Sequence, residues 1–161
     1  MPVYATLTLR VRATVYTALA GGIVAFVMHS PFGGDLARYL RQVPFFQISA
    51  MIGAGLAGAA LCDGFGRARW QGHGLGAVTA VTTTCLGAIA GALIATFLNA
   101  TLSSQRMEGA AEVGSLGLLA IMDGIATSVP VAVTWVVAMA CLHWQVGKLR
   151  RSTASQHPAT T

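Results

Sequence analysis

Apolar residues fall in four long runs along this 161-residue chain, and polar residues gather between them. The runs cover residues 14–30, 46–62, 75–100 and 117–142, and none of them contains Lys or Arg. A helix needs about 20 apolar residues to cross the hydrocarbon layer of a membrane. Because the runs are continuously apolar rather than alternating, helices are favoured over the strands of a membrane barrel. The pattern predicts an all-α integral membrane protein with a four-helix transmembrane bundle.

The composition supports a chain whose main solvent is lipid. Hydrophobic residues make up 55% of it and charged residues only 9%, with a mean hydropathy of +0.66. Soluble domains carry about 25% charged residues. The length suits one domain over residues 1–151, and the polar tail at 152–161 is expected to be disordered.

The basic residues predict the orientation of the bundle. When the runs alternate in direction, the flanks of both termini and the loop between the second and third runs share one side. That side receives Arg10, Arg12, Arg67, Arg69, Lys148, Arg150 and Arg151, and the other receives Arg38, Arg41 and Arg106. The excess of Lys and Arg on cytoplasmic loops therefore places both termini in the cytoplasm, most simply in a bacterial inner membrane.

The net charge of +5 needs no nucleic-acid partner, because basic flanks also favour anionic lipid. Trp70 belongs to the aromatic residues that settle at headgroup level. The expected lipid-headgroup contacts are Arg67, Arg69, Trp70, Lys148, Arg150 and Arg151.

A short amphipathic helix is predicted after the first span. Asp35 suits an N-cap, and the apolar residues that follow recur at helical spacing until Pro44. These residues are Leu36, Tyr39, Leu40 and Val43. The segment is expected to lie flat in the membrane interface.

Small residues four positions apart mark the second and third spans. Helices in a bilayer associate through close backbone contact, which small residues permit. The expected packing positions are Gly53, Ala57, Gly58, Gly87 and Gly91. The pattern does not decide whether these helices pack on each other or on a second chain.

One carboxylate interrupts the fourth run. At 1.5 Å per residue, Asp123 lies roughly 9 Å from the outer end of that run, and threonines follow it on nearly the same face. A charged carboxylate near the bilayer centre costs at least ~2.5–3.5 kcal/mol on insertion scales, so Asp123 needs polar neighbours. Matching depths between the third and fourth spans gives the candidates for a buried polar, ion or proton site as Asp123, Thr127, Thr134, Thr83, Thr96 and Asn99.

Asp123 admits two interpretations. It is either a buried hydrogen-bonding residue that fixes helix register beside a bend at Pro130, or a proton or cation site in a small carrier. The structural interpretation is preferred, because no second charged residue occurs within the runs.

Four residues at the inner face are weak candidates for a zinc site, namely Cys62, His73, Cys141 and His143. Their spacing is poor, because no CxxC pair exists, so no metal and no cofactor is predicted. The sequence also lacks GxSxG and HExxH.

The function that these patterns favour is a non-catalytic subunit or scaffold of a larger membrane assembly, with lipids and other transmembrane subunits or copies of itself as partners. The alternative is a small proton- or ion-coupled transporter or channel, formed as a homo-oligomer around Asp123.

Overall fold

The computed structural model describes residues 3–30, 45–66, 70–103 and 110–155. The predicted interfacial helix, Arg67, Arg69 and the end of the tail lie outside these residues. So do the basic residues Arg38, Arg41 and Arg106 of the predicted outer side.

Every element in the described part of the chain is a helix. The elements are α1 (Val3–His29), α3 (Phe46–Leu61), the 3-10 turn η1 (Cys62–Gly64), α4 (Trp70–Ser103), α5 (Ala110–Thr127) and α6 (Val129–Ser155). Four segments are long and apolar enough to cross a membrane: Leu7–His29, Phe46–Gly64, Gly72–Thr101 and Val129–Ser152. Within the described residues, this confirms the prediction of an all-helical chain with four helices long and apolar enough to span a membrane, which is consistent with a helical membrane bundle.

The fourth span differs from its prediction. Instead of one bent helix over 117–142, the chain forms two helices that meet at Ser128. The Ser128 hydroxyl accepts a long hydrogen bond from the Val131 N–H, 3.5 Å away, and its carbonyl accepts one from Ala132 at 2.9 Å. Pro130 therefore lies in the first turn of α6, where the missing N–H removes no helical hydrogen bond. The segment that is long and apolar enough to cross a membrane begins at Val129 and excludes Asp123.

Helix α3 packs closely against both α1 and α4, at points where at least one helix of the pair carries a small residue. A Cβ atom added at Gly53 would lie 2.5 Å from the Gly91 nitrogen and would also collide with the Gly87 carbonyl oxygen. On the other face of α3, Gly58 leaves room for the buried side chain of Thr17. The small residues of α3 and α4 thus meet within one chain, through the backbone contact that stabilises helix pairs in lipid.

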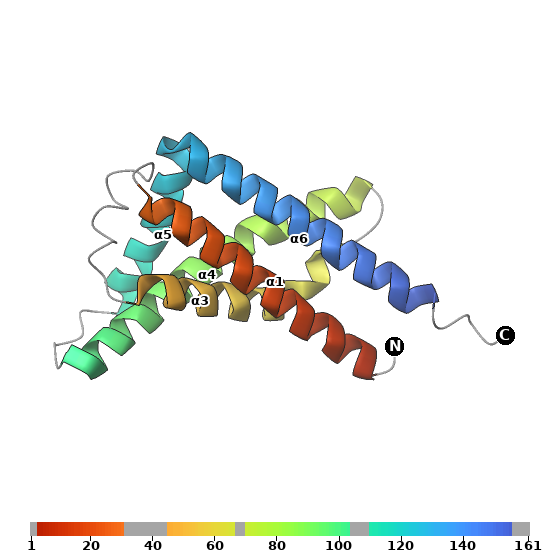
Figure 1. Ribbon diagram of the computed structural model, residues 1–161, viewed down its shortest axis with the longest axis horizontal. Helices are drawn as coiled ribbons and strands as arrows, with labels where there is room; N and C mark the ends of the chain where they lie inside the picture. Colours follow the sequence, from red (N-terminus) through yellow and green to blue (C-terminus); the bar gives the residue numbers. More distant parts are fainter. Residues whose placement is uncertain (1–2, 31–44, 67–69, 104–109, 156–161) are drawn as a thin grey trace.

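Helix α6 lies over α1 and over the turn between α3 and α4. One apolar cluster joins these elements through Ala13, Cys62, Phe65, Ala80, Leu142 and Val146. A second cluster joins α1, α5 and α6 through Val24, Met28, Ile121 and Val131. Figure 1 shows that α5 runs steeply across the end of the bundle where α1 ends, and that the N-terminal end of α1 and the C-terminal end of α6 share the opposite end.

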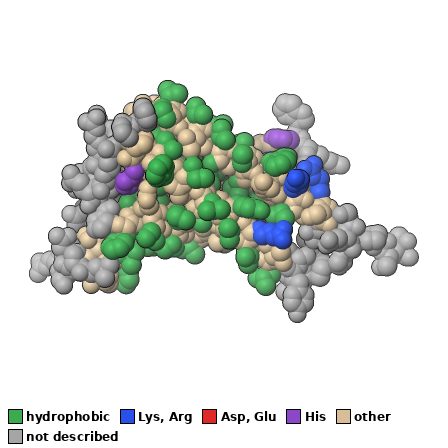
Figure 2. Space-filling view, in the orientation of Figure 1, with side chains coloured by type: hydrophobic (Ala, Val, Ile, Leu, Met, Phe, Trp, Pro, Cys, Tyr) green, Lys and Arg blue, Asp and Glu red, His purple; other side chains and the backbone are tan. Residues whose placement is uncertain are grey.

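The outer surface is largely apolar. Exposed side chains on α1 recur about every four residues, from Leu7 and Val11 to Ile23 and Phe26, and α6 exposes Val133 among others. On the face drawn in Figure 2, hydrophobic side chains are spread along the described part of the bundle, and the Lys and Arg side chains of the described residues on this face lie near the end that holds the two termini. This distribution suits helices that are surrounded by lipid and end at a charged interface.

Candidate functional site

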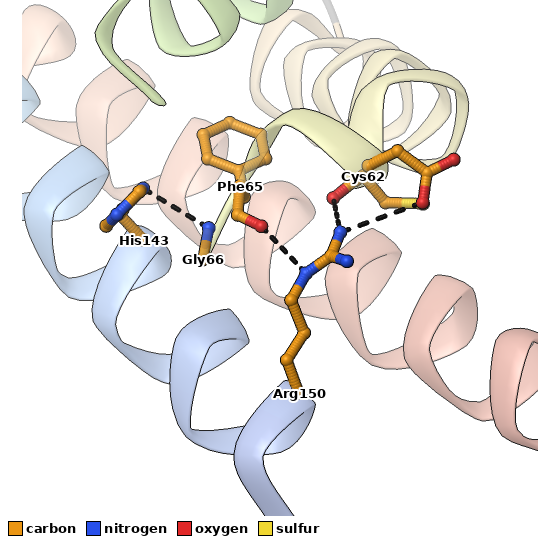
Figure 3. Close-up of polar contacts among 6 residues, drawn as sticks. Cys62, Phe65, Gly66, His143 and Arg150 are labelled. Atoms are coloured by element: carbon orange, nitrogen blue, oxygen red, sulfur yellow. Dashed lines mark hydrogen bonds and ion pairs between the residues drawn. The ribbon is translucent and has the colours of Figure 1, made fainter. Parts of the chain in front are cut away.

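The most elaborate set of polar contacts between described helices is formed by α6 around the turn that joins α3 to α4. The turn is Cys62–Gly66, and α6 meets it through residues spaced i, i+3, i+4 and i+7. These are His143, Val146, Gly147 and Arg150. Residues with this spacing share one face of a helix. Together we call the turn and these four residues the turn clasp (Figure 3).

The side chain of Arg150 binds the backbone carbonyls of the turn. Its Nε donates to the Phe65 carbonyl oxygen at 2.9 Å, and Nη2 donates to the Cys62 carbonyl oxygen at 3.1 Å. Nη2 also lies 3.6 Å from Asp63 Oδ1, in an ion pair whose carboxylate is largely exposed. The carbonyls at the end of a helix have no intrahelical donor, and a basic side chain can supply one. The predicted contact of Arg150 with lipid headgroups stays a prediction, and the structure adds these two hydrogen bonds to backbone carbonyls.

Phe65 and Gly66 make the turn fit closely against α6. The Phe65 side chain is fully buried and belongs to the first apolar cluster. Gly66 has φ of +72°, which L side chains rarely adopt, and a Cβ there would lie 2.8 Å from the Gly147 Cα atom. Glycine is therefore required at Gly66 both by backbone conformation and by the approach of α6.

His143 adds a second polar contact to the turn. The Gly66 N–H donates to Nδ1 of His143 at 3.3 Å (Figure 3). An imidazole nitrogen that accepts a hydrogen bond carries no proton, so this contact requires the neutral ring with its proton on Nε2. The ring of His73, from α4, lies 5.6 Å from that of His143 between centroids.

The weak zinc candidates do not form a ligand set. Of these four described residues only His73 and His143 come together, because Cys62 is buried at the start of the turn and Cys141 is exposed on α6. Within the described residues no group of three or more His, Cys, Asp or Glu side chains is placed to hold a metal ion. Nδ1 of His143 already accepts the Gly66 N–H. For Nε2 to bind a metal ion, its proton would have to move to Nδ1, and the hydrogen bond to Gly66 would be lost.

Asp123 lies on α5, outside the four helices that are long and apolar enough to span a membrane. Its neighbour Gly124 packs against Met28, next to the C-terminal residue of α1, so the carboxylate belongs to the end of the bundle farthest from the termini. The Thr127 hydroxyl donates to the Asp123 backbone carbonyl at 2.7 Å and not to its carboxylate. Asp123 is half-buried, and its carboxylate makes no hydrogen bond or ion pair with another described residue.

The other polar candidates are dispersed over α4 and α6. Thr96 donates to the Ala92 carbonyl of its own helix at 3.0 Å, and Thr83 is buried with no partner for its hydroxyl among the described residues. Asn99 lies near the end of α4, and Thr134 is half-buried on α6. None of these side chains contacts the Asp123 carboxylate by a hydrogen bond within the described chain.

Sequence reasoning missed the polar contacts of Trp135 and of Arg150. Trp135 Nε1 donates to the Thr84 hydroxyl at 2.8 Å. These two residues directly follow Thr134 and Thr83, which were expected to lie at the same depth in the membrane. A donor such as the indole N–H within an apolar run is a signal that a partner is needed. The contacts of Arg150 carried no such signal, because their acceptors are backbone carbonyls.

Comparisons with family models, with curated proteins and with solved structures found no match to this chain.

Proposed function

We propose that this chain is a non-catalytic integral membrane subunit of a larger assembly, in which a second transmembrane chain or another copy of itself pairs with Asp123. The observation that carries the proposal is the half-buried Asp123 carboxylate on the apolar helix α5, without a polar partner among the described residues. A partly desolvated carboxylate is stabilised by a cation or by hydrogen-bond donors.

The surroundings of Asp123 favour a partner outside the described chain. Leu116, Leu119 and Met122 are exposed on α5, so a carboxylate beside them faces an apolar surrounding. A helix that carries Lys, Arg or an amide side chain would satisfy the carboxylate and cover these side chains in one contact.

The proposal includes an orientation and a membrane. Lys148, Arg150 and Arg151 lie near the C-terminal end of α6, and Arg10 and Arg12 lie near the start of α1, at the same end of the bundle. The excess of basic residues near this end supports cytoplasmic termini, and a bacterial inner membrane is the simplest setting for such a chain.

The test is mass measurement of the protein purified from its native membrane in mild detergent, with and without Asp123→Asn. The expected wild-type result is a complex heavier than one chain. Asn carries no charge and cannot form an ion pair, so Asp123→Asn should lower the association constant of the complex. The decrease should be at least about tenfold if the ionic contact is worth roughly 1.4 kcal/mol or more. Asp63→Asn is the matched control, because it removes a carboxylate from the opposite end and should leave the complex intact.

A strictly monomeric wild-type protein with no co-purifying chain would contradict the subunit proposal. The transporter alternative makes a different prediction for the same variant. In liposomes, Asp123→Asn should abolish proton or cation flux for a carrier, whereas a subunit should show no flux of its own.

A further inference from the structure

We infer that the turn clasp is a proton-sensitive latch, in which protonation of His143 loosens the turn Cys62–Gly66 from α6. The inference rests on the geometry of the clasp and is independent of the proposed function. Its starting point is the hydrogen bond from the Gly66 N–H to His143 Nδ1, which exists only while that nitrogen is unprotonated.

Protonation of His143 changes this contact from attraction to repulsion. A proton on Nδ1 would point at the Gly66 N–H, so that two donors face each other and the hydrogen bond is lost. The ring cannot retreat toward α4 without cost, because a Cβ at Gly76 would lie 2.5 Å from the Nδ1 atom, which shows how closely α4 approaches. When the hydrogen bond is lost, the turn at Gly66 is therefore expected to move away from α6, while the His143 ring stays in place.

The charged groups around His143 come from several elements. His73 of α4 has its ring 5.6 Å away, so protonation of both rings brings two positive charges together. Arg150 adds a positive charge on the same face of α6, and Asp63 of η1 is already paired with it. Arg10 of α1 places a further positive charge near Cys62, the first residue of the turn. A positive charge on His73 therefore opposes a closed clasp once His143 is charged.

The remaining contacts limit how far the turn can open. Arg150 can bond the Phe65 and Cys62 carbonyls at any charge of His143, because guanidinium stays protonated, so these bonds close the turn again after each transient opening. Protonation therefore removes one of the anchors of the turn and leaves the others. The expected response is a local, reversible opening that becomes more frequent as the pH falls and His143 takes up a proton.

Cys62 provides a direct readout of this opening. Cys62 is the first residue of the turn and is 1% exposed, so a thiol reagent reaches its side chain only when the turn opens. The protein would carry Cys85→Ala and Cys141→Ala, which leaves Cys62 as its single thiol. The rate of maleimide labelling in nanodiscs is measured at pH 8.0 and pH 5.5 and divided by the rate for the denaturant-unfolded protein at the same pH, which removes the intrinsic effect of pH on the thiol.

The normalised rate is expected to rise roughly five- to tenfold from pH 8.0 to pH 5.5, the factor that corresponds to about one hydrogen bond in the opening equilibrium. In His143→Asn, a side-chain oxygen near the place of Nδ1 accepts from Gly66 at every pH, so the rate should stay low and flat. In His143→Phe it should be high at both pH values. His73→Asn should reduce the rise, because one of the repelling charges is removed.

His29→Asn is the matched control, because His29 lies at the other end of α1 and bonds the Ala25 carbonyl. It should leave the pH response unchanged. A flat normalised rate in the wild-type background, or an undiminished rise in His143→Asn, would overturn the latch. Circular dichroism at both pH values separates local opening, which leaves the helix content unchanged, from global unfolding, which lowers it and would also count against a latch.

Discussion

Arg150 of α6 donates a hydrogen bond to the carbonyl oxygen of Phe65, 2.9 Å away and 85 residues earlier in the chain. The same guanidinium reaches the Cys62 carbonyl at 3.1 Å. Through these two bonds, the last helix fixes the turn between two earlier ones. The fully buried Phe65 side chain makes the contact a part of the core as well as a polar anchor.

Replacing Arg150 by Ala should destabilise the bundle by about 1.5–3 kcal/mol, because two backbone carbonyls lose a charged donor. Arg150→Lys should recover only part of this loss, since an ammonium group cannot reproduce the geometry of the guanidinium fork. The free energy of unfolding in a mixed-detergent titration measures both. Equal stability of Arg150→Ala and the wild type would show that the clasp contributes nothing to the fold.

Gly66→Ala should destabilise the protein by at least ~2 kcal/mol, because an L side chain is strained at positive φ and its Cβ would collide with α6. Gly74→Ala is the matched control within α4, where an added Cβ meets no atom within 4 Å. This second change should be neutral or stabilise the helix by about 0.5–1 kcal/mol. Similar unfolding free energies for the two variants would contradict the close approach of α6 to the turn.

Pro130→Ala distinguishes a helix start at Ser128 from a bend within one long helix. In the first turn of α6 the proline costs little, so its replacement should change stability by no more than about 0.5 kcal/mol. Ser128→Ala should cost about 0.5–1 kcal/mol through loss of the cap. Within a continuous helix, Pro130→Ala would instead stabilise the protein by roughly 3 kcal/mol. Unfolding titrations of both variants decide between these arrangements.

Trp135 and Thr84 should show energetic coupling across the α4 and α6 interface. Their hydrogen bond of 2.8 Å joins the two helices by side chains. A double-mutant cycle with Trp135→Phe and Thr84→Val should give a coupling energy of about 0.5–1.5 kcal/mol, the range found for polar pairs between helices in membranes. Strictly additive effects of the two substitutions would mean that the bond makes no net contribution.

Sequence patterns were enough to predict the broad fold, because membrane-spanning helices must be long, apolar and free of basic residues. The first three runs correspond to spanning segments of α1, α3 and α4. The predicted start of the fourth span, at residue 117, differs from its start at Val129 in the structure. Hydropathy does not distinguish a proline that bends a helix from one in its first turn. Ser128 carried that information, since serine two residues before a proline suits an N-cap followed by a helical first turn.

The turn clasp was less accessible from sequence than the fold. Cys62, His73 and His143 were recognised as polar or reactive groups at one end of the bundle, and the structure brings the two histidines together. The role of Arg150 depends on backbone carbonyls 85 and 88 residues away, which no local pattern reports. The position of Asp123 likewise depended on where the last spanning helix begins.

The most direct test of the four-span arrangement is side-specific labelling of single cysteines placed at Thr6, near the start of α1, and at Ser152, near the end of α6, in a cysteine-free background. A membrane-impermeant maleimide is applied to intact cells and to inverted membrane vesicles. The account predicts that both positions are labelled only in the inverted vesicles, from the cytoplasmic side. Labelling of the two positions from opposite sides would contradict an even number of crossings and the bundle built on it.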